Sequence, residues 1–147
     1  MRDPVAYVLI AAVIVLWGFW GFLGKIGLAR RMPPASMFFA EVTVGFLIGA
    51  ALLAVLAVRG QPLPWHQPWN ALGVLSGVGL AVGLLFYYLV LERAWASVVV
   101  PVTATYPIVT VLLSVIVLGE RLGWAQSLGL GLIVVGLILL LSGPIAP

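Results

Sequence analysis

Hydrophobic residues run along this chain in five long stretches, separated by short segments that hold most of the charged residues. The stretches cover about residues 5–28, 35–58, 70–91, 96–118 and 124–142. Each is close to the roughly 20 residues that an α-helix needs to cross the ~30 Å hydrocarbon layer of a bilayer. Strands are not expected, because a spanning strand needs a closed barrel and alternating polarity. The pattern therefore predicts an all-α integral membrane protein with five transmembrane helices in one domain, residues 1–147.

The composition supports this interpretation and excludes several kinds of chemistry. The chain is 64% hydrophobic and only 7% charged, whereas a soluble domain carries about 25% charged residues. It has no cysteine and a single histidine, His66, so neither a disulfide framework nor a metal site is predicted. No nucleophile–base set and no phosphate-binding loop occurs in the sequence. We therefore expect no cofactor and no enzymatic activity.

The seven basic residues lie near the ends of the predicted spans and form no patch for nucleic acid. One face of the membrane would carry Arg2, Arg59 and Arg121. The other face would carry Arg30, Arg31 and Arg93, together with Lys25 if it counts. The asymmetry of Lys and Arg between the two faces sets the orientation of a membrane protein. A distribution as even as this one leaves two interpretations. Either a weak bias selects one orientation, or the chain inserts both ways and pairs antiparallel, which we favour.

One carboxylate lies inside the second span. In the segment PPASMFFAEVTVGFLIGA, residues 33–50, Glu41 follows six residues after the expected helix start. Insertion of a charged group at mid-span costs roughly 2.5–3.5 kcal/mol, and such residues usually face a bundle interior or a water-filled cavity. Burial favours the uncharged form of a carboxyl group. Glu41 is therefore the leading candidate for substrate or ion binding and for proton coupling.

The first span offers candidates on the same side of the membrane. Lys25 lies near its end, and a tight turn would bring the lysine within reach of Glu41; alternatively, Lys25 extends to the interface and Glu41 is a structural acceptor. Trp17 and Trp20 lie too deep for interfacial anchors and are expected to wall a cavity or to contribute packing. At the end of the third span, Tyr87 is a binding candidate or an interfacial residue.

Polar residues of the fourth span share one helical face. They are Thr103, Tyr106, Thr110 and Ser114, at spacings typical of a helix. Pro101 and Pro107 in the same span lack a backbone N–H, so each leaves a carbonyl without its usual donor. Freed carbonyls in broken or kinked helices often lie at transporter substrate sites. We expect a hinge and a substrate-binding face here, although a kink stabilised by neighbouring groups is the alternative.

The fifth span is predicted to be structural. Gly129, Gly136 and Gly143 recur every seven residues and form a smooth stripe. Stripes of small residues allow close helix packing in lipid. We expect this stripe to contribute to a contact between subunits.

Several of these segments resemble a known family. WGFWGFLGK, PPASMFFAE and the stretch ASVVVPVTATYPIVTVLLSVIVLGERLGWAQSLGLGLIVVGLIL are similar to the EamA branch of the drug/metabolite transporter superfamily. Most members carry two such five-helix units in tandem, the second inverted. For a single unit, the resemblance implies an antiparallel homodimer, or pairing with an oppositely oriented paralogue. The family does not supply proton coupling through Glu41: related four-helix transporters carry their glutamate in the first span.

These observations lead to an expected function. We expect a multi-pass subunit of the cytoplasmic membrane that moves a small organic metabolite or cation by alternating access. Its partners would be the lipid bilayer, a second copy and a small-molecule substrate. A flippase for lipid-linked head groups is one alternative, which assays with lipid would distinguish. A non-transporting assembly subunit is another, but it has no need for Glu41 or for the polar face of the fourth span.

Overall fold

The computed structural model of the protein describes residues 4–61 and 70–143. Within these residues all regular structure is helical, and five spans are long and apolar enough to cross a membrane. This confirms the predicted fold class of an all-α membrane protein. Two residues named above, Arg2 and His66, lie outside the described part of the chain.

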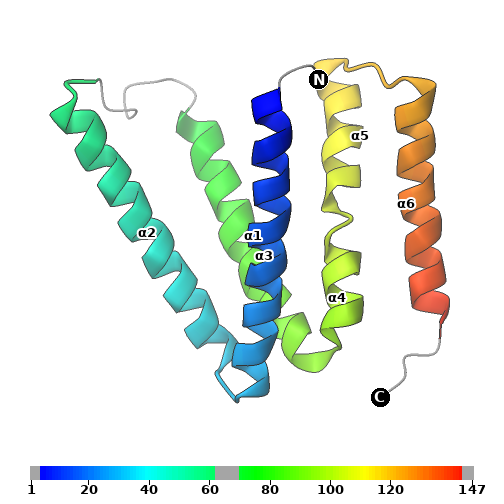
Figure 1. The fold of residues 1–147 in the computed structure, drawn as a ribbon, viewed down its shortest axis with the longest axis horizontal. Coiled ribbons are helices and arrows are strands. Elements are labelled where there is room, and N and C mark those ends of the chain that lie inside the picture. Colours follow the sequence, from blue (N-terminus) through cyan, green and yellow to red (C-terminus); the bar gives the residue numbers. More distant parts are fainter. Residues whose placement is uncertain (1–3, 62–69, 144–147) are drawn as a thin grey trace. The chain divides into compact units, whose positions relative to one another are not determined.

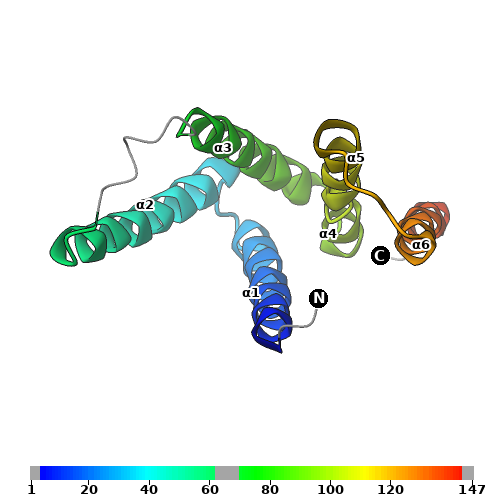
Figure 2. The ribbon, with the colours of Figure 1, turned by 90° about the horizontal axis from the view of Figure 1, so that it is seen from above.

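The chain forms two compact units, Met1–Arg93 and Ala94–Pro147, so its organisation as one domain stays a prediction. The first unit contains α1 (Pro4–Ala29), α2 (Pro34–Val58) and α3 (Asn70–Arg93) (Figure 1). Helix α3 contacts both α1 and α2. The three helices come together near the beginning of α2, as the view from above also shows (Figure 2).

A tight turn between α1 and α2 brings the end of α1 next to the beginning of α2. The amide of Met32 donates to the carbonyl of Gly27 at 3.1 Å, which closes the end of α1. Arg31 takes a left-handed backbone conformation with φ of 65°, as is usual for the residue that ends a helix in this way. Pro34 then begins α2 at a position where its missing N–H costs no hydrogen bond. The turn therefore places Glu41 beside the last turns of α1.

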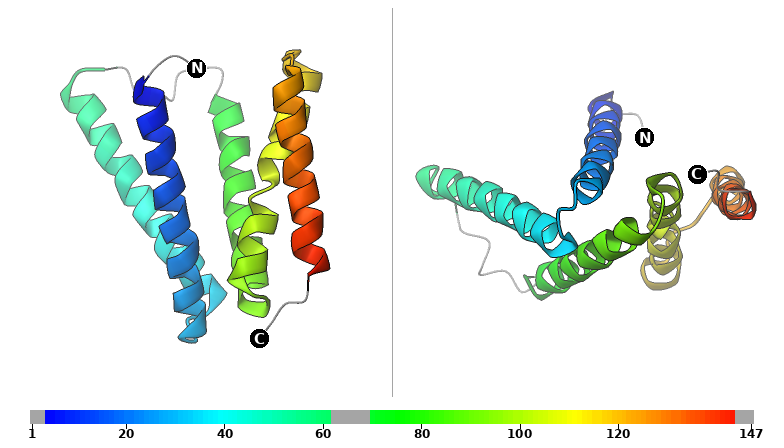
Figure 3. Two further views of the ribbon diagram at one scale, coloured as in Figure 1. Left: turned by 45° about the vertical axis from the view of Figure 1, so that its right-hand side comes forward. Right: turned by 90° about the horizontal axis from the view of Figure 1, so that it is seen from below.

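The second unit consists of α4 (Ala96–Thr103), α5 (Tyr106–Leu118) and α6 (Trp124–Ser142). Helix α5 follows α4 after a short irregular turn, and α6 runs back alongside them (Figure 3). Helices α4 and α5 together have the length and hydropathy of one membrane span. The sequence predicts one span over residues 96–118 with a hinge at Pro101 and Pro107, and the structure interrupts the helix at residues 104–105.

The break follows from the hydrogen bonds around Pro107. The amide of Thr105 donates to the Val102 carbonyl at 3.2 Å, and the amide of Ile108 donates to the Thr105 carbonyl at 2.9 Å. Both bonds reach back three residues instead of four, which tightens the backbone. Pro107 lies in the first turn of α5 and has no N–H, so the carbonyl of Thr103 lacks its usual helical donor.

Candidate functional site

Glu41 joins all three helices of the first unit. The indole N–H of Trp20 on α1 donates to Glu41 Oε1 at 2.7 Å. The hydroxyl of Tyr88 on α3 donates to the same oxygen. A carboxylate in an apolar setting needs such donors, because an unsatisfied polar group buried away from water costs about 1–3 kcal/mol and a charged group costs more. Glu41 is thus held by two neutral donors from two other helices.

Aromatic rings surround these hydrogen bonds. Trp20 and Tyr87 are stacked, with ring centroids 4.8 Å apart and an interplanar angle of 24°. Tyr88 meets Tyr87 edge-on at 5.5 Å and Trp20 edge-on at 6.4 Å. Aromatic pairs of this kind contribute about 0.5–1.5 kcal/mol each beyond their buried area. We call Trp20, Glu41, Tyr87 and Tyr88 the glutamate cluster.

Burial differs within the glutamate cluster. Tyr88 is completely buried and Tyr87 is 9% exposed, whereas Trp20 and Glu41 are only half-buried. The two tyrosines are therefore the most buried residues of the cluster, and Trp20 and Glu41 are its more accessible ones.

Glycine on α1 makes room for Tyr88. Gly21, Gly24 and Leu28 are the buried residues of α1, at helical spacing on one face. A Cβ atom on Gly24 would lie 3.0 Å from Tyr88 Cε1 and 3.5 Å from its hydroxyl oxygen. The close approach of α3 to α1, and with it the bond from Tyr88 to Glu41, therefore depends on the absence of a side chain at position 24.

Gly24→Ala is accordingly expected to destabilise the protein. Alanine normally stabilises a helix relative to glycine by about 0.5–1 kcal/mol, but here its methyl group must push the Tyr88 ring aside, at a cost of about 1–3 kcal/mol. The matched control is Gly18→Ala on the same helix, where a Cβ meets no atom within 4 Å. We expect Gly24→Ala to melt at a lower temperature in detergent than Gly18→Ala. Equal melting temperatures would contradict the tight contact.

Lys25 stabilises the end of α3. Its ammonium donates to the Leu91 carbonyl at 2.8 Å, which belongs to the last turn of the helix, where carbonyls have no helical donor. A positive charge there also interacts favourably with the helix dipole. The expected pair between Lys25 and Glu41 is not among the contacts that the structure describes. A role of Lys25 in binding stays a prediction.

The predicted polar face of the fourth span is divided by the break. Thr103 is the last residue of α4, and its hydroxyl donates to the Val99 carbonyl at 2.8 Å. Tyr106, at the start of α5, is 55% exposed. Farther along α5, Thr110 is exposed and Ser114 half-buried. The structure therefore interrupts this face between Thr103 and Tyr106, and its role in binding stays a prediction.

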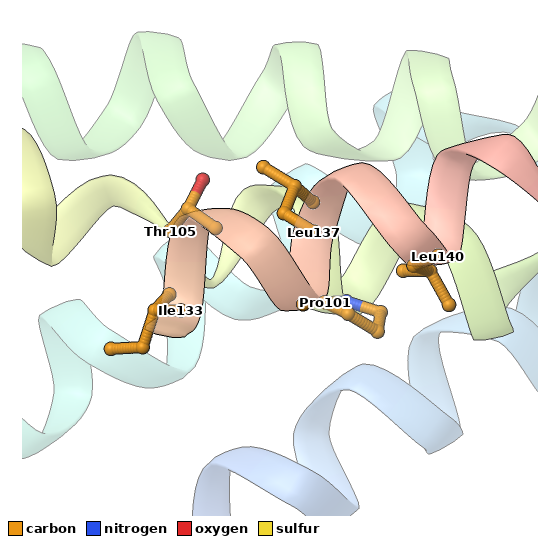
Figure 4. Close-up of a pocket in the computed structure, with 6 residues that line it drawn as sticks. Pro101, Thr105, Ile133, Leu137 and Leu140 are labelled. Carbon is orange, nitrogen blue, oxygen red and sulfur yellow. The ribbon is translucent and has the colours of Figure 1, made fainter. Parts of the chain in front are cut away.

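A pocket of about 280 Å³ lies between α4 and α6 (Figure 4). It is lined by Pro101, Thr105, Ile133, Gly136, Leu137 and Leu140. The hydroxyl of Thr105 is its one polar side-chain group, and this hydroxyl donates to the Val102 carbonyl at 2.6 Å. The pocket thus offers an aliphatic surface and no charge. It suits an apolar group better than a polar substrate.

The predicted glycine stripe of α6 and the second deep tryptophan make no close helix contact like that of Gly24 among the described residues. A Cβ on Gly129 or Gly136 of α6 would meet no atom within 4 Å, and Gly143 caps the end of that helix. Trp17 on α1 is 57% exposed, one turn away from the buried cluster. The contact between subunits through the glycine stripe stays a prediction.

Tyr88 is the member of the cluster that sequence reasoning noted beside Tyr87 but did not place among the binding candidates. The pair Tyr87–Tyr88 near the end of a span has the position of an interfacial belt, and nothing in the hydropathy separates the two residues. The signal that could have identified Tyr88 is the spacing of Gly21 and Gly24 on α1, which predicts a close helix contact.

Comparison with known proteins gives the family. Residues 4–142 match the EamA-like transporter family. An uncharacterized protein of Methanocaldococcus jannaschii is 30% identical over 135 residues, covering 92% of this chain and 95% of the relative. An uncharacterized transporter in the cobO 3′ region of a Sinorhizobium species is 26% identical over 137 residues, covering 84% of this chain and 95% of the relative. No solved structure matches significantly. The chain is therefore a multi-pass membrane protein that belongs to the EamA-like transporter family.

Proposed function

We propose that the protein is a secondary transporter subunit that exchanges a small organic cation for a proton at Glu41. The observation that carries this proposal is the position of Glu41 in a membrane-spanning helix, with two neutral donors on one oxygen. Ionisable residues inside membrane spans are costly and usually mark ion or substrate pathways. A structural acceptor for Trp20 and Tyr88 would not need to be an acid, since a neutral amide oxygen accepts the same hydrogen bonds.

The environment of Glu41 favours a mobile positive charge. Trp20 and Tyr88 are neutral, so the hydrogen bonds described for the carboxylate leave its negative charge without compensation by a cation. A proton or a bound organic cation would supply that compensation, and only one of them at a time. Binding of one therefore displaces the other, which couples their movement in opposite directions.

Alternating access requires that the site opens to each side of the membrane in turn. We propose that two copies of the chain insert antiparallel in the cytoplasmic membrane and adopt two different conformations. When each copy takes the conformation of the other, the site between them opens to the opposite side. The nearly equal Lys/Arg numbers on the two faces support this arrangement.

A proton-release assay tests the exchange directly. The purified protein would be reconstituted into liposomes that contain a pH-sensitive dye, with a proton gradient directed outward. A panel of organic cations that do not cross the bilayer unaided would then be added outside. Those cations that the protein transports are expected to raise the internal pH. Liposomes without protein serve as the control. Failure of every cation in a broad panel to change internal pH would contradict proton-coupled cation transport.

A further inference from the structure

The hydroxyl of Tyr87 is buried without a hydrogen-bond partner in the part of the chain that the structure describes. The residue is 9% exposed, and the hydroxyl oxygen itself is closed off from solvent. Buried hydroxyls are nearly always hydrogen-bonded, so an exception calls for an explanation. The neighbouring hydroxyl, that of Tyr88, donates to Glu41. Of two adjacent tyrosines on α3, one therefore donates to Glu41, and the other has a buried hydroxyl that lacks a partner among the described residues.

The carboxylate of Glu41 accepts its described hydrogen bonds on one of its two oxygens. The indole of Trp20 and the hydroxyl of Tyr88 both donate to Oε1, whereas no hydrogen bond to Oε2 is described for residues 4–61 and 70–143. The ring of Tyr87 stacks on Trp20 at 4.8 Å, so it belongs to the same cluster. One cluster thus retains two unused acceptors, the Oε2 atom and the Tyr87 hydroxyl oxygen.

We propose that these two atoms bind the transported cation through two of its N–H groups, and that Tyr87 thereby selects primary and secondary ammonium ions over more highly methylated ones. The inference rests on the proposed function, because it places the cation at Glu41. In this arrangement Glu41 Oε2 accepts one N–H, and the Tyr87 oxygen accepts a second once the entering cation uncovers the buried hydroxyl. A tertiary ammonium ion has one N–H and loses the contact to Tyr87, and a quaternary ion has none.

The ring geometry argues against the alternative, an aromatic cage for quaternary ammonium ions. Such a cage presents open ring faces to the cation. Here Trp20 and Tyr87 each cover one face of the other ring at an interplanar angle of 24°, so that face is closed to a cation. Tyr88 is completely buried and directs its hydroxyl to Glu41. Hydrogen bonding is therefore the means of recognition that the cluster retains.

A methylation series on one scaffold tests this assignment. Binding of benzylammonium, N,N-dimethylbenzylammonium and benzyltrimethylammonium to the full chain in detergent would be measured by titration calorimetry. The wild type is expected to bind the primary ion at least about tenfold more tightly than the tertiary ion, as for the loss of one hydrogen bond to a charged group. The quaternary ion should bind more weakly still. This comparison needs no variant and is independent of effects on folding.

Tyr87→Phe isolates the contribution of the hydroxyl. In this variant the primary and tertiary ions are expected to bind with nearly equal affinity, because the second acceptor is gone and the ring is kept. Tyr7→Phe is the matched control, since Tyr7 lies on α1 and is 57% exposed; it should retain the wild-type ratio. Ratios are taken within each variant, so a partial loss of folded protein cancels.

The outcomes separate this inference from the proposed function. Equal affinities for the primary and tertiary ions in the wild type, or an unchanged ratio in Tyr87→Phe, would overturn the role of Tyr87. If Glu41→Gln then abolished binding of all three ions, the proposed cation site would still stand. Binding that survives Glu41→Gln, or no binding of any ion to the wild type, would overturn both.

Discussion

Replacing Glu41 with glutamine is expected to reduce cation-driven proton release from liposomes to the level of protein-free liposomes. The amide oxygen of glutamine accepts hydrogen bonds from Trp20 and Tyr88 as the carboxylate does, so the three helices of the first unit stay joined. The side chain, however, carries neither a negative charge for the cation nor a proton to exchange. The initial rate of internal pH change, with the wild type measured in parallel, would check this.

A second glutamate provides the control for this substitution. Glu92 lies on the same unit, near the end of α3, and is exposed. Glu92→Gln removes the same charge and is expected to transport at nearly the wild-type rate. Melting temperatures in detergent would establish that both variants fold. If folded Glu41→Gln retained half of the wild-type rate, Glu41 would have no place in the exchange, and the coupling would have to be sought in another residue.

The spans could be predicted from the sequence because the bilayer imposes one strong condition. Each crossing needs about 20 apolar residues with all backbone hydrogen bonds satisfied inside the helix, and the ends of α1, α2 and α6 lie at or next to the predicted bounds. The break between α4 and α5 was less predictable. Pro107 indicates a disturbance, but whether a helix bends or stops depends on local bonds such as that from Thr105 to Val102.

The glutamate cluster could be predicted only in part. Glu41 stands out because a carboxylate in an apolar stretch has no structural necessity, and Trp20 because it lies too deep for the interface. The direction of a side chain around a helix is a different matter. Lys25 is near Glu41 along the chain, yet the described hydrogen bond of its ammonium goes to Leu91. Tyr88 reaches Glu41 only because Gly24 leaves space for its ring.

The second large effect is expected from changes of charge in the loops between the spans. The double variant Arg30→Gln/Arg31→Gln removes positive charge from the loops on one face of the membrane. The double variant Arg59→Gln/Arg121→Gln removes it from the loops on the other face. Because positive loops remain on the cytoplasmic side, each double variant should insert in a single orientation, opposite to that of the other. If the transporter needs antiparallel subunits, each double variant alone should be inactive. Their co-expression should restore transport.

Orientation can be measured independently of activity, since the chain contains no cysteine. One cysteine appended after residue 147 would be labelled in intact cells with an impermeant maleimide, before and after permeabilisation. About half of the wild-type protein should be labelled from outside, as expected for a chain that inserts in both orientations. The Arg30/Arg31 variant should label almost fully and the Arg59/Arg121 variant hardly at all, because an odd number of spans places the two termini on opposite faces.

Wild-type labelling from one side only would exclude the antiparallel homodimer and require an oppositely oriented partner chain. Full activity of a single-orientation variant on its own would show that inversion of a subunit is unnecessary for transport.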